Sequence, residues 1–83
     1  MRITLRYFAS LREALGPGES LEVEEGLSVG ALRERLIARG GAHAERLARG
    51  RALRCALNKQ MCGEDAQLAA GDELAFFPPV TGG

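Results

Sequence analysis

Apolar and polar residues alternate near both ends of the chain, and this pattern predicts two strands. Residues 2–7 place an apolar side chain at every second position, which is the period of a strand with one buried face. Residues 72–77 are the other strongly apolar segment, in which Leu74 and Phe76 are expected to face inward. Because these are the two most apolar strands, we expect them to be neighbours in the centre of a sheet.

A short helix and a second strand are predicted between the first strand and residue 24. Residues 9–15 have helical character, with Ser10 as a candidate N-cap, and the Gly-Pro-Gly sequence at 16–18 ends the helix. Residues 20–24 alternate again. They fit the second arm of a hairpin-like pair that is joined to the first strand through the small helix.

The longest helix is predicted to begin after Ser28, the best N-cap in the chain. Leu27 and Leu32 occupy the positions of a hydrophobic staple around this cap. The apolar stripe of the helix consists of Val29, Leu32, Leu36 and Ile37. The remaining faces are expected to project Arg33, Glu34, Arg35 and Arg39 into solvent. The pair Gly40-Gly41 ends the helix.

The second half of the chain completes the pattern of a small mixed α+β domain. We expect a turn or short helix at 42–48, a strand at 53–58 and a turn or short strand at 59–62, and Leu68 reaches the core from an irregular stretch. One main helix packed across one face of a mixed sheet is the economical arrangement of these elements. This is a ubiquitin-like β-grasp, with a domain at 1–77 and a flexible tail at 78–83.

Composition and charge exclude several classes of function. The chain has 83 residues, which make one domain, and 11 basic residues balance 11 acidic ones. A net charge of zero gives no bulk attraction to nucleic acid or to membranes, so neither is expected as a partner. Arginines gather between residues 33 and 54; a solvated helical face is the favoured explanation, and a docking surface for an acidic partner is the alternative.

The cysteines and the histidine do not form a recognisable site in the sequence. Cys55 and Cys62 are seven residues apart, and His43 is the only histidine. This spacing matches neither a metal site nor a Cys-x-x-Cys redox pair, so no metal is predicted and Cys55 is expected to be a small buried apolar residue. The first residues lead directly into a strand without a signal-peptide pattern, so we predict a cytoplasmic protein with reduced thiols.

The end of the chain is the strongest candidate for chemistry. Its last six residues are Pro78, Pro79, Val80, Thr81, Gly82 and Gly83. Two prolines favour an extended, stiff spacer, and six extended residues reach about 20 Å. Two glycines without side chains form a thin end that fits a narrow channel and finishes in a carboxylate.

A carboxylate reacts as an electrophile only after activation, for instance as a mixed anhydride with AMP. The chain has no phosphate-binding G-x-x-x-x-G-K-[ST] loop. His43 is its only histidine, and no Ser/His/Asp or Cys/His constellation is recognisable around it. Activation must therefore come from another protein. On this interpretation the chain is a substrate and carrier, and not itself the catalyst.

Three apolar side chains near the tail are candidates for a docking surface. Phe8 and Phe77 are out of phase with the inward residues of their strands, so they are expected to share the outer face of the sheet, together with Met61. An exposed apolar patch beside the start of the tail would be an interface. The alternative is that both rings belong to the rim of the core.

The ending and the opening of the chain resemble the small, sulfur-carrying subunit of molybdopterin synthase. The resemblance lies in the ending from Gly71 to Gly83, above all Phe-Phe-Pro-Pro-Val-x-Gly-Gly, and in the opening that runs through Tyr7-Phe8-Ala9. It implies that a ubiquitin-activating-like adenylyltransferase adenylates Gly83 with ATP, and that a sulfur donor converts the adenylate to a thiocarboxylate. No cofactor is bound permanently.

The same resemblance implies where the sulfur goes. The tail enters the large subunit of molybdopterin synthase, in a heterotetramer, and the thiocarboxylate donates sulfur to a cyclic pyranopterin precursor. Gly82 keeps the passage narrow, and Phe8, Met61 and Phe77 match positions at the subunit contact. Three alternatives stay open: a sulfur carrier for thiamine synthesis or tRNA thiolation, a ubiquitin-like protein modifier, and an interaction domain with an inert tail.

Overall fold

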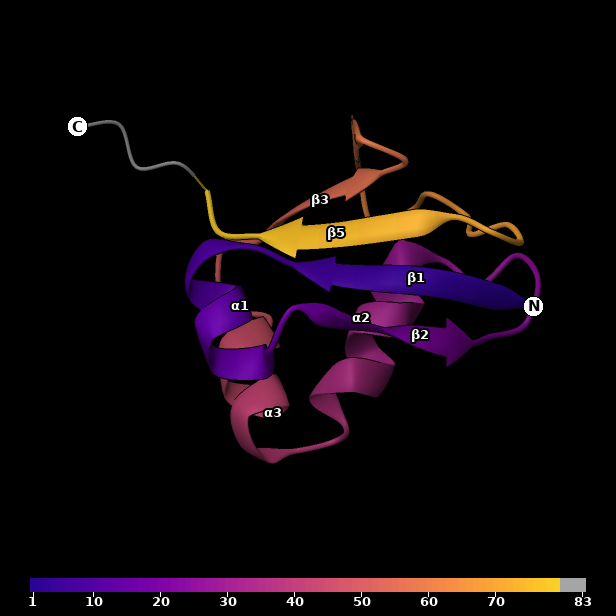
Figure 1. The fold of residues 1–83 in the computed structure, drawn as a ribbon. Helices are drawn as coiled ribbons and strands as arrows, with labels where there is room; N and C mark the ends of the chain where they lie inside the picture. Colours follow the sequence, from indigo (N-terminus) through magenta and orange to yellow (C-terminus); the bar gives the residue numbers. More distant parts are fainter. Residues whose placement is uncertain (80–83) are drawn as a thin grey trace.

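The structure, a computed structural model, describes residues 1–79. The described part of the chain forms one mixed sheet with the strand order β2-β1-β5-β3-β4 (Figure 1). The strands are β1 Arg2–Tyr7, β2 Gly18–Glu22, β3 Arg54–Leu57, β4 Gln60–Cys62 and β5 Glu73–Phe77. The helices are α1 Ala9–Leu15, α2 Val29–Ile37 and α3 Gly41–Leu47. None of these helices is both long and apolar enough to cross a membrane.

The first and last strands are parallel neighbours in the middle of the sheet, as predicted. Leu5 lies opposite Leu74 and Tyr7 lies opposite Phe76. All four side chains are almost completely buried. Because β1 and β5 run in the same direction, β5 finishes at the end of the sheet where β1 passes into α1 (Figure 1).

Strand β2 pairs with β1 in antiparallel orientation and begins two residues before the predicted start. Its first residue, Gly18, has a φ of +138°, and a Cβ at this position would lie 1.9 Å from the carbonyl oxygen of Leu5. Only glycine permits the strand to approach β1 this closely. The strand ends at Glu22, so the predicted 20–24 segment was displaced towards the C-terminus.

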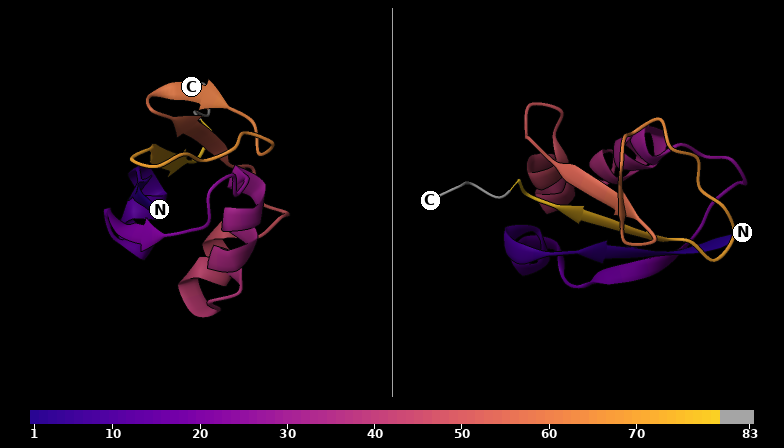
Figure 2. Two further views of the ribbon diagram at one scale, coloured as in Figure 1. Left: turned by 90° about the vertical axis from the view of Figure 1, so that its right-hand side faces the viewer. Right: turned by 90° about the horizontal axis from the view of Figure 1, so that it is seen from above.

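The helices cover one face of the sheet and leave the opposite face open (Figure 2). The side-chain oxygen of Ser28 accepts a hydrogen bond of 3.1 Å from the backbone N–H of Ala31, which confirms the predicted N-cap of α2. The prediction that Ser10 caps α1 was wrong. Phe8 occupies the N-cap position without a side-chain hydrogen bond, and Ser10 lies inside the first turn. The sheet, the helices and their order confirm the predicted β-grasp fold.

Arg33 does not project into solvent, contrary to the prediction for the polar faces of α2. It is only 4% exposed. Its guanidinium donates hydrogen bonds to the carbonyl oxygens of Leu47 at 2.8 Å, Ala48 at 2.6 Å and Arg51 at 3.2 Å, and to Glu64 at 2.9 Å. The C-terminus of α3 provides two of these acceptors, and such carbonyls attract a cation. Arg33 therefore ties α2 to the end of α3 and to the loop before β3.

Candidate functional site

The candidate site lies on the open face of the sheet, at the end where β5 finishes. Successive side chains of a strand point to opposite faces, so Leu74 and Phe76 enter the core while Glu73, Ala75 and Phe77 point to the open face. The register extends this face across the neighbouring strands. Ala75 lies opposite Ala56 of β3. The open face is therefore charged at one end of β5 and apolar at the other.

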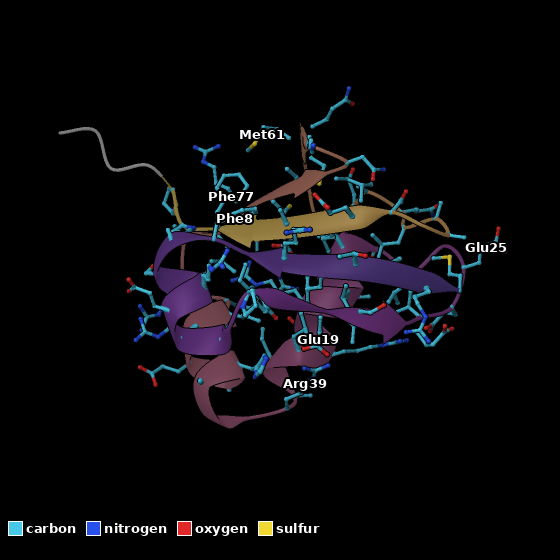
Figure 3. All side chains as sticks on the ribbon, in the orientation of Figure 1. Phe8, Glu19, Glu25, Arg39, Met61 and Phe77 are labelled. Atoms are coloured by element: carbon cyan, nitrogen blue, oxygen red, sulfur yellow. The ribbon has the colours of Figure 1, made fainter. Side chains whose placement is uncertain are left out.

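Five side chains form the apolar part of the open face, which we call the apolar patch: Phe8, Ala56, Met61, Ala75 and Phe77. Met61 of β4 lies opposite Ala56. The backbone N–H of Phe8 donates to the carbonyl oxygen of Phe76 at 3.2 Å, which keeps Phe8 beside the end of β5. Figure 3 shows Phe8, Phe77 and Met61 on the same side of the sheet, away from the helices.

The exposure of the patch decides between the two interpretations of its rings. Phe8 is 42% exposed and Met61 is 59% exposed, so neither is packed into the core. Phe77 is half-buried. The structure thus brings the three predicted residues together as an apolar surface, and their role in binding a partner stays a prediction.

The two alanines of the patch were not identified from the sequence. Ala56 and Ala75 are 9% and 8% exposed and lie opposite each other in the middle of the patch. Their small side chains form a low floor between the larger rings and Met61. The alternation of Ala75 with Leu74 and Phe76 was a signal for its position, but its pairing with Ala56 depends on the register of two strands that are distant in the sequence.

Charged side chains border the patch. Arg6 forms an ion pair of 3.1 Å with Glu73, and both lie on the open face next to the apolar part. Arg54 lies opposite Phe77 at the other border, is exposed, and forms no ion pair with any residue in the range 1–79. An apolar centre with a charged border is the usual anatomy of a protein interface.

The start of the tail is held against the body of the domain. Pro78 and Pro79 follow β5 directly and are both half-buried, and Pro79 lines a cavity of about 260 Å³. The other predicted tail residues, Val80, Thr81, Gly82 and Gly83, lie outside the described residues.

The same cavity is lined by Met61 of the patch and, on the core side of the sheet, by Cys55 of β3 and Cys62 of β4. Arg33 of α2 and Glu64, which follows β4, also line it. A hydrogen bond from Arg49 is the main cause that lowers the pKa of Glu64, and a hydrogen bond from Arg33 acts in the same direction. Glu64 is therefore an anion at neutral pH and serves Arg33 as a counter-ion. The Glu64 carboxylate is therefore suited to a structural role as an anion, and not to the role of a general acid that donates a proton.

Comparison with known proteins gives this geometry a context. The family model of the ThiS family matches residues 5–83. The molybdopterin synthase sulfur carrier subunit of Escherichia coli (strain K12) is 38% identical, over 98% of this chain and 99% of the relative. The subunit of the same name from Haemophilus influenzae is 35% identical, with the same coverage of 98% and 99%.

Solved structures show the same fold. The small archaeal modifier protein 1 of Haloferax volcanii is 26% identical with a TM-score of 0.74, and the match covers 95% of this chain and 98% of that one. A ubiquitin of Caldiarchaeum subterraneum is 19% identical with a TM-score of 0.60, over 100% of this chain and 98% of that one, which is a likeness of fold alone.

Proposed function

The chain belongs to the ThiS family, and from this premise we propose that it is the sulfur-carrying small subunit of a molybdopterin synthase. Two relatives named as such subunits match almost the whole chain. The observation that carries the proposal is the apolar patch, which lies beside Pro78, the residue that begins the Pro-Pro-Val-Thr-Gly-Gly sequence. The patch docks the chain on the large subunit, and the tail delivers the sulfur.

The chemistry takes place at the carboxyl group of Gly83. A carboxylate oxygen attacks the α-phosphate of ATP in an adenylyltransferase of the ubiquitin-activating type, and pyrophosphate leaves. A sulfur donor then displaces AMP, so that a thiocarboxylate remains on the chain. In the large subunit its sulfur attacks a cyclic pyranopterin precursor. The activating enzyme binds the ATP, so the chain itself needs no permanent cofactor. We place all of these steps in the cytoplasm.

The short reach of the tail explains why docking and delivery are coupled. Four residues beyond Pro79 extend about 14 Å at most. An active site must therefore lie within this distance of Pro79, next to the patch. Gly82 and Gly83 add no side chain at the narrow end of the passage, while Val80 and Thr81 span the distance to it.

The test separates loading from delivery. The full chain is incubated with the adenylyltransferase, ATP and a sulfur source, and its intact mass is measured. We expect the mass gain that replacement of one oxygen by sulfur produces, and no gain after deletion of Gly82 and Gly83. The loaded chain is then mixed with the large subunit and the precursor. Loading without transfer would contradict this function, and failure to load would contradict carriage of sulfur altogether.

A second candidate function is protein modification. The structural similarity to small archaeal modifier protein 1 favours it, because that protein shares the fold and 26% of the aligned residues. In this case the activated Gly83 would form isopeptide bonds with lysines. Attachment of the chain to other proteins in the same incubation, detected by mass spectrometry, would support modification in place of sulfur transfer.

A further inference from the structure

Two cysteines that are separate in the sequence meet across the β3–β4 hairpin. Cys55 and Cys62 lie directly opposite each other in the antiparallel register. Their sulfur atoms are 3.6 Å apart, and the thiol of Cys55 also lies 3.3 Å from the carbonyl oxygen of Cys62. Both thiols are free. The two sulfurs are therefore in contact without a covalent bond.

The hairpin holds this pair in a geometry that a disulfide can use. Directly opposite residues of an antiparallel pair have Cα atoms about 4.5–5.5 Å apart, which lies within the range of about 4.4–6.8 Å seen in disulfides. The turn that joins the strands fixes the register, because Asn58 and Lys59 have φ values of 51° and 69°. Two consecutive left-handed residues are typical of a tight two-residue hairpin turn. Formation of an S–S bond of about 2.05 Å needs the sulfurs to approach by about 1.5 Å.

The pair is also accessible from one side. Cys55 and Cys62 line the cavity of about 260 Å³ described above. Cys62 is half-buried, whereas Cys55 is 6% exposed. A small thiol reagent that enters the cavity therefore reaches Cys62 first, and Cys55 is positioned to react with the product.

We propose that Cys55 and Cys62 form a modification site, at which a small disulfide such as oxidised glutathione converts the dithiol reversibly into an intramolecular disulfide. The thiolate of Cys62 attacks one sulfur of the oxidant, and one glutathione thiolate leaves. Cys55 then loses its proton and attacks the sulfur of Cys62, the mixed disulfide breaks, and the second glutathione leaves. Two electrons pass to the oxidant, and the two thiol protons are recovered on the released glutathione.

The second step is expected to be the slower one. Burial is the main cause that raises the pKa of the Cys55 thiol to about 12, so its reactive thiolate is scarce at neutral pH. The close approach of the two sulfurs offsets this scarcity, because a reaction between positioned groups has a high effective concentration. The cysteine chemistry uses neither the terminal carboxyl group nor a partner protein, so it stands independently of the proposed function.

The disulfide would fasten the edge of the sheet. Strand β4 has three residues, lies at the edge and pairs only with β3 among the described strands. It also carries Met61 of the apolar patch. A covalent link between Cys55 and Cys62 would hold this strand, and the patch residue on it, against the rest of the sheet.

The experiment uses the reduced full chain and an excess of oxidised glutathione. At completion we expect the intact mass to fall by two hydrogen atoms, with recovery after dithiothreitol. Trypsin cuts after Arg54 and Lys59, so the peptides 55–59 and 60–83 are expected to be joined only through the disulfide. The thermal midpoint should rise on the order of 10 °C, because the closed loop restricts the unfolded chain.

Two variants test the order of the steps. Cys55→Ala should retain glutathione on Cys62 as a stable mixed disulfide, and Cys62→Ala should react far more slowly than the wild type. The proposal is overturned if the wild-type chain stays reduced, ends as a stable mixed disulfide on Cys62, or forms a disulfide-linked dimer in place of the internal bond. Each of these products has a distinct intact mass.

Discussion

The two faces of the sheet use the same strands in opposite ways. On the helix-covered face, Leu5, Leu74 and Phe76 are at most 1% exposed. On the open face, Phe8, which follows β1 directly, and Met61 of β4 leave roughly half of their surface in solvent. Because side chains alternate along a strand, the covered face holds the side chains that stabilise the isolated domain. The open face holds side chains that can be buried in a complex.

This contrast leads to a clear expectation for substitutions. A change on the covered face should lower the free energy of unfolding, because it removes contacts that the isolated chain already makes. A change in the apolar patch should leave stability nearly unchanged and weaken binding to the large subunit. Single substitutions on each face can break this separation or make it quantitative.

The largest effect on stability is expected for Leu74→Ala. The Leu74 side chain is completely buried in the centre of the sheet. Its truncation leaves a cavity and should lower the free energy of unfolding by about 3 kcal/mol. Met61→Ala on the open face is the matched control and should cost less than about 1 kcal/mol. Both values come from urea denaturation, and equal losses in the two variants would refute the separation of the faces.

Arg33→Ala is expected to be nearly as damaging. It leaves the carbonyl oxygens of Leu47, Ala48 and Arg51 without their buried donor, and it removes the partner of Glu64. We expect a loss of about 3 kcal/mol in the free energy of unfolding.

Arg33→Lys sharpens this prediction, because it keeps the charge and loses the fork of donors. It should recover only part of the lost stability. If Arg33→Lys unfolds at the same urea concentration as the wild type, charge alone accounts for the interaction and the geometry of the guanidinium does not matter.

Phe77→Asp is expected to act on binding. A carboxylate within the apolar patch should raise the dissociation constant for the large subunit by roughly 100-fold, because it would be desolvated in the interface. Its cost in stability should stay near 1 kcal/mol, since Phe77 is half-buried. Binding is measured by calorimetry and stability by urea denaturation.

Ser20→Asp is the control for Phe77→Asp. Ser20 is exposed on β2, at the opposite edge of the same open face, so the substitution adds the same charge outside the patch. It should bind nearly as tightly as the wild type. A 100-fold loss in Ser20→Asp would mean that general charge repulsion, and not the patch, governs docking.

Local and periodic features of the fold were predictable from the sequence, whereas features that depend on distant contacts were not. The alternation at both ends predicted β1 and β5, and Ser28 predicted the start of α2. The burial of Arg33 was not predictable from its place on a helix, because it depends on carbonyl acceptors from residues 47 to 51 and on Glu64. The sequence also placed Phe8, Met61 and Phe77 on one face.

The remaining parts of the site depend on register. Ala56 and Ala75 form the floor of the patch because β3 and β5 pair in one particular alignment. The contact between Cys55 and Cys62 likewise depends on a hairpin turn with two left-handed residues that are not glycine. Propensities make Asn58 acceptable there, but they do not predict Lys59 in this conformation.

The smallest predicted effect belongs to an exposed charged pair at the edge of the helix-covered face. Arg39 donates two hydrogen bonds to Glu19, at 2.7 and 2.8 Å, and these are the main cause that lowers the pKa of the Glu19 carboxyl below its usual range. Figure 3 shows the pair on the helical side of the sheet. Both side chains are more than one third exposed, so the pair should contribute only about 0.5–1 kcal/mol.

The contribution of Glu19 should depend on pH in a defined direction. A carboxyl with a lowered pKa in the folded state stabilises the protein above its unfolded pKa of about 4.3, and this stabilisation is lost as the pH falls through the lower folded value. Glu19→Gln should therefore be less stable than the wild type at pH 7, and the difference should shrink as the pH falls below the unfolded pKa of about 4.3. Urea denaturation at pH 7 and along an acid series measures the difference. If the difference in stability persists at low pH, packing of the Glu19 side chain causes it, and not its charge. Solvent exposure of the ion pair would then not explain why Glu19 contributes less to stability than buried Arg33.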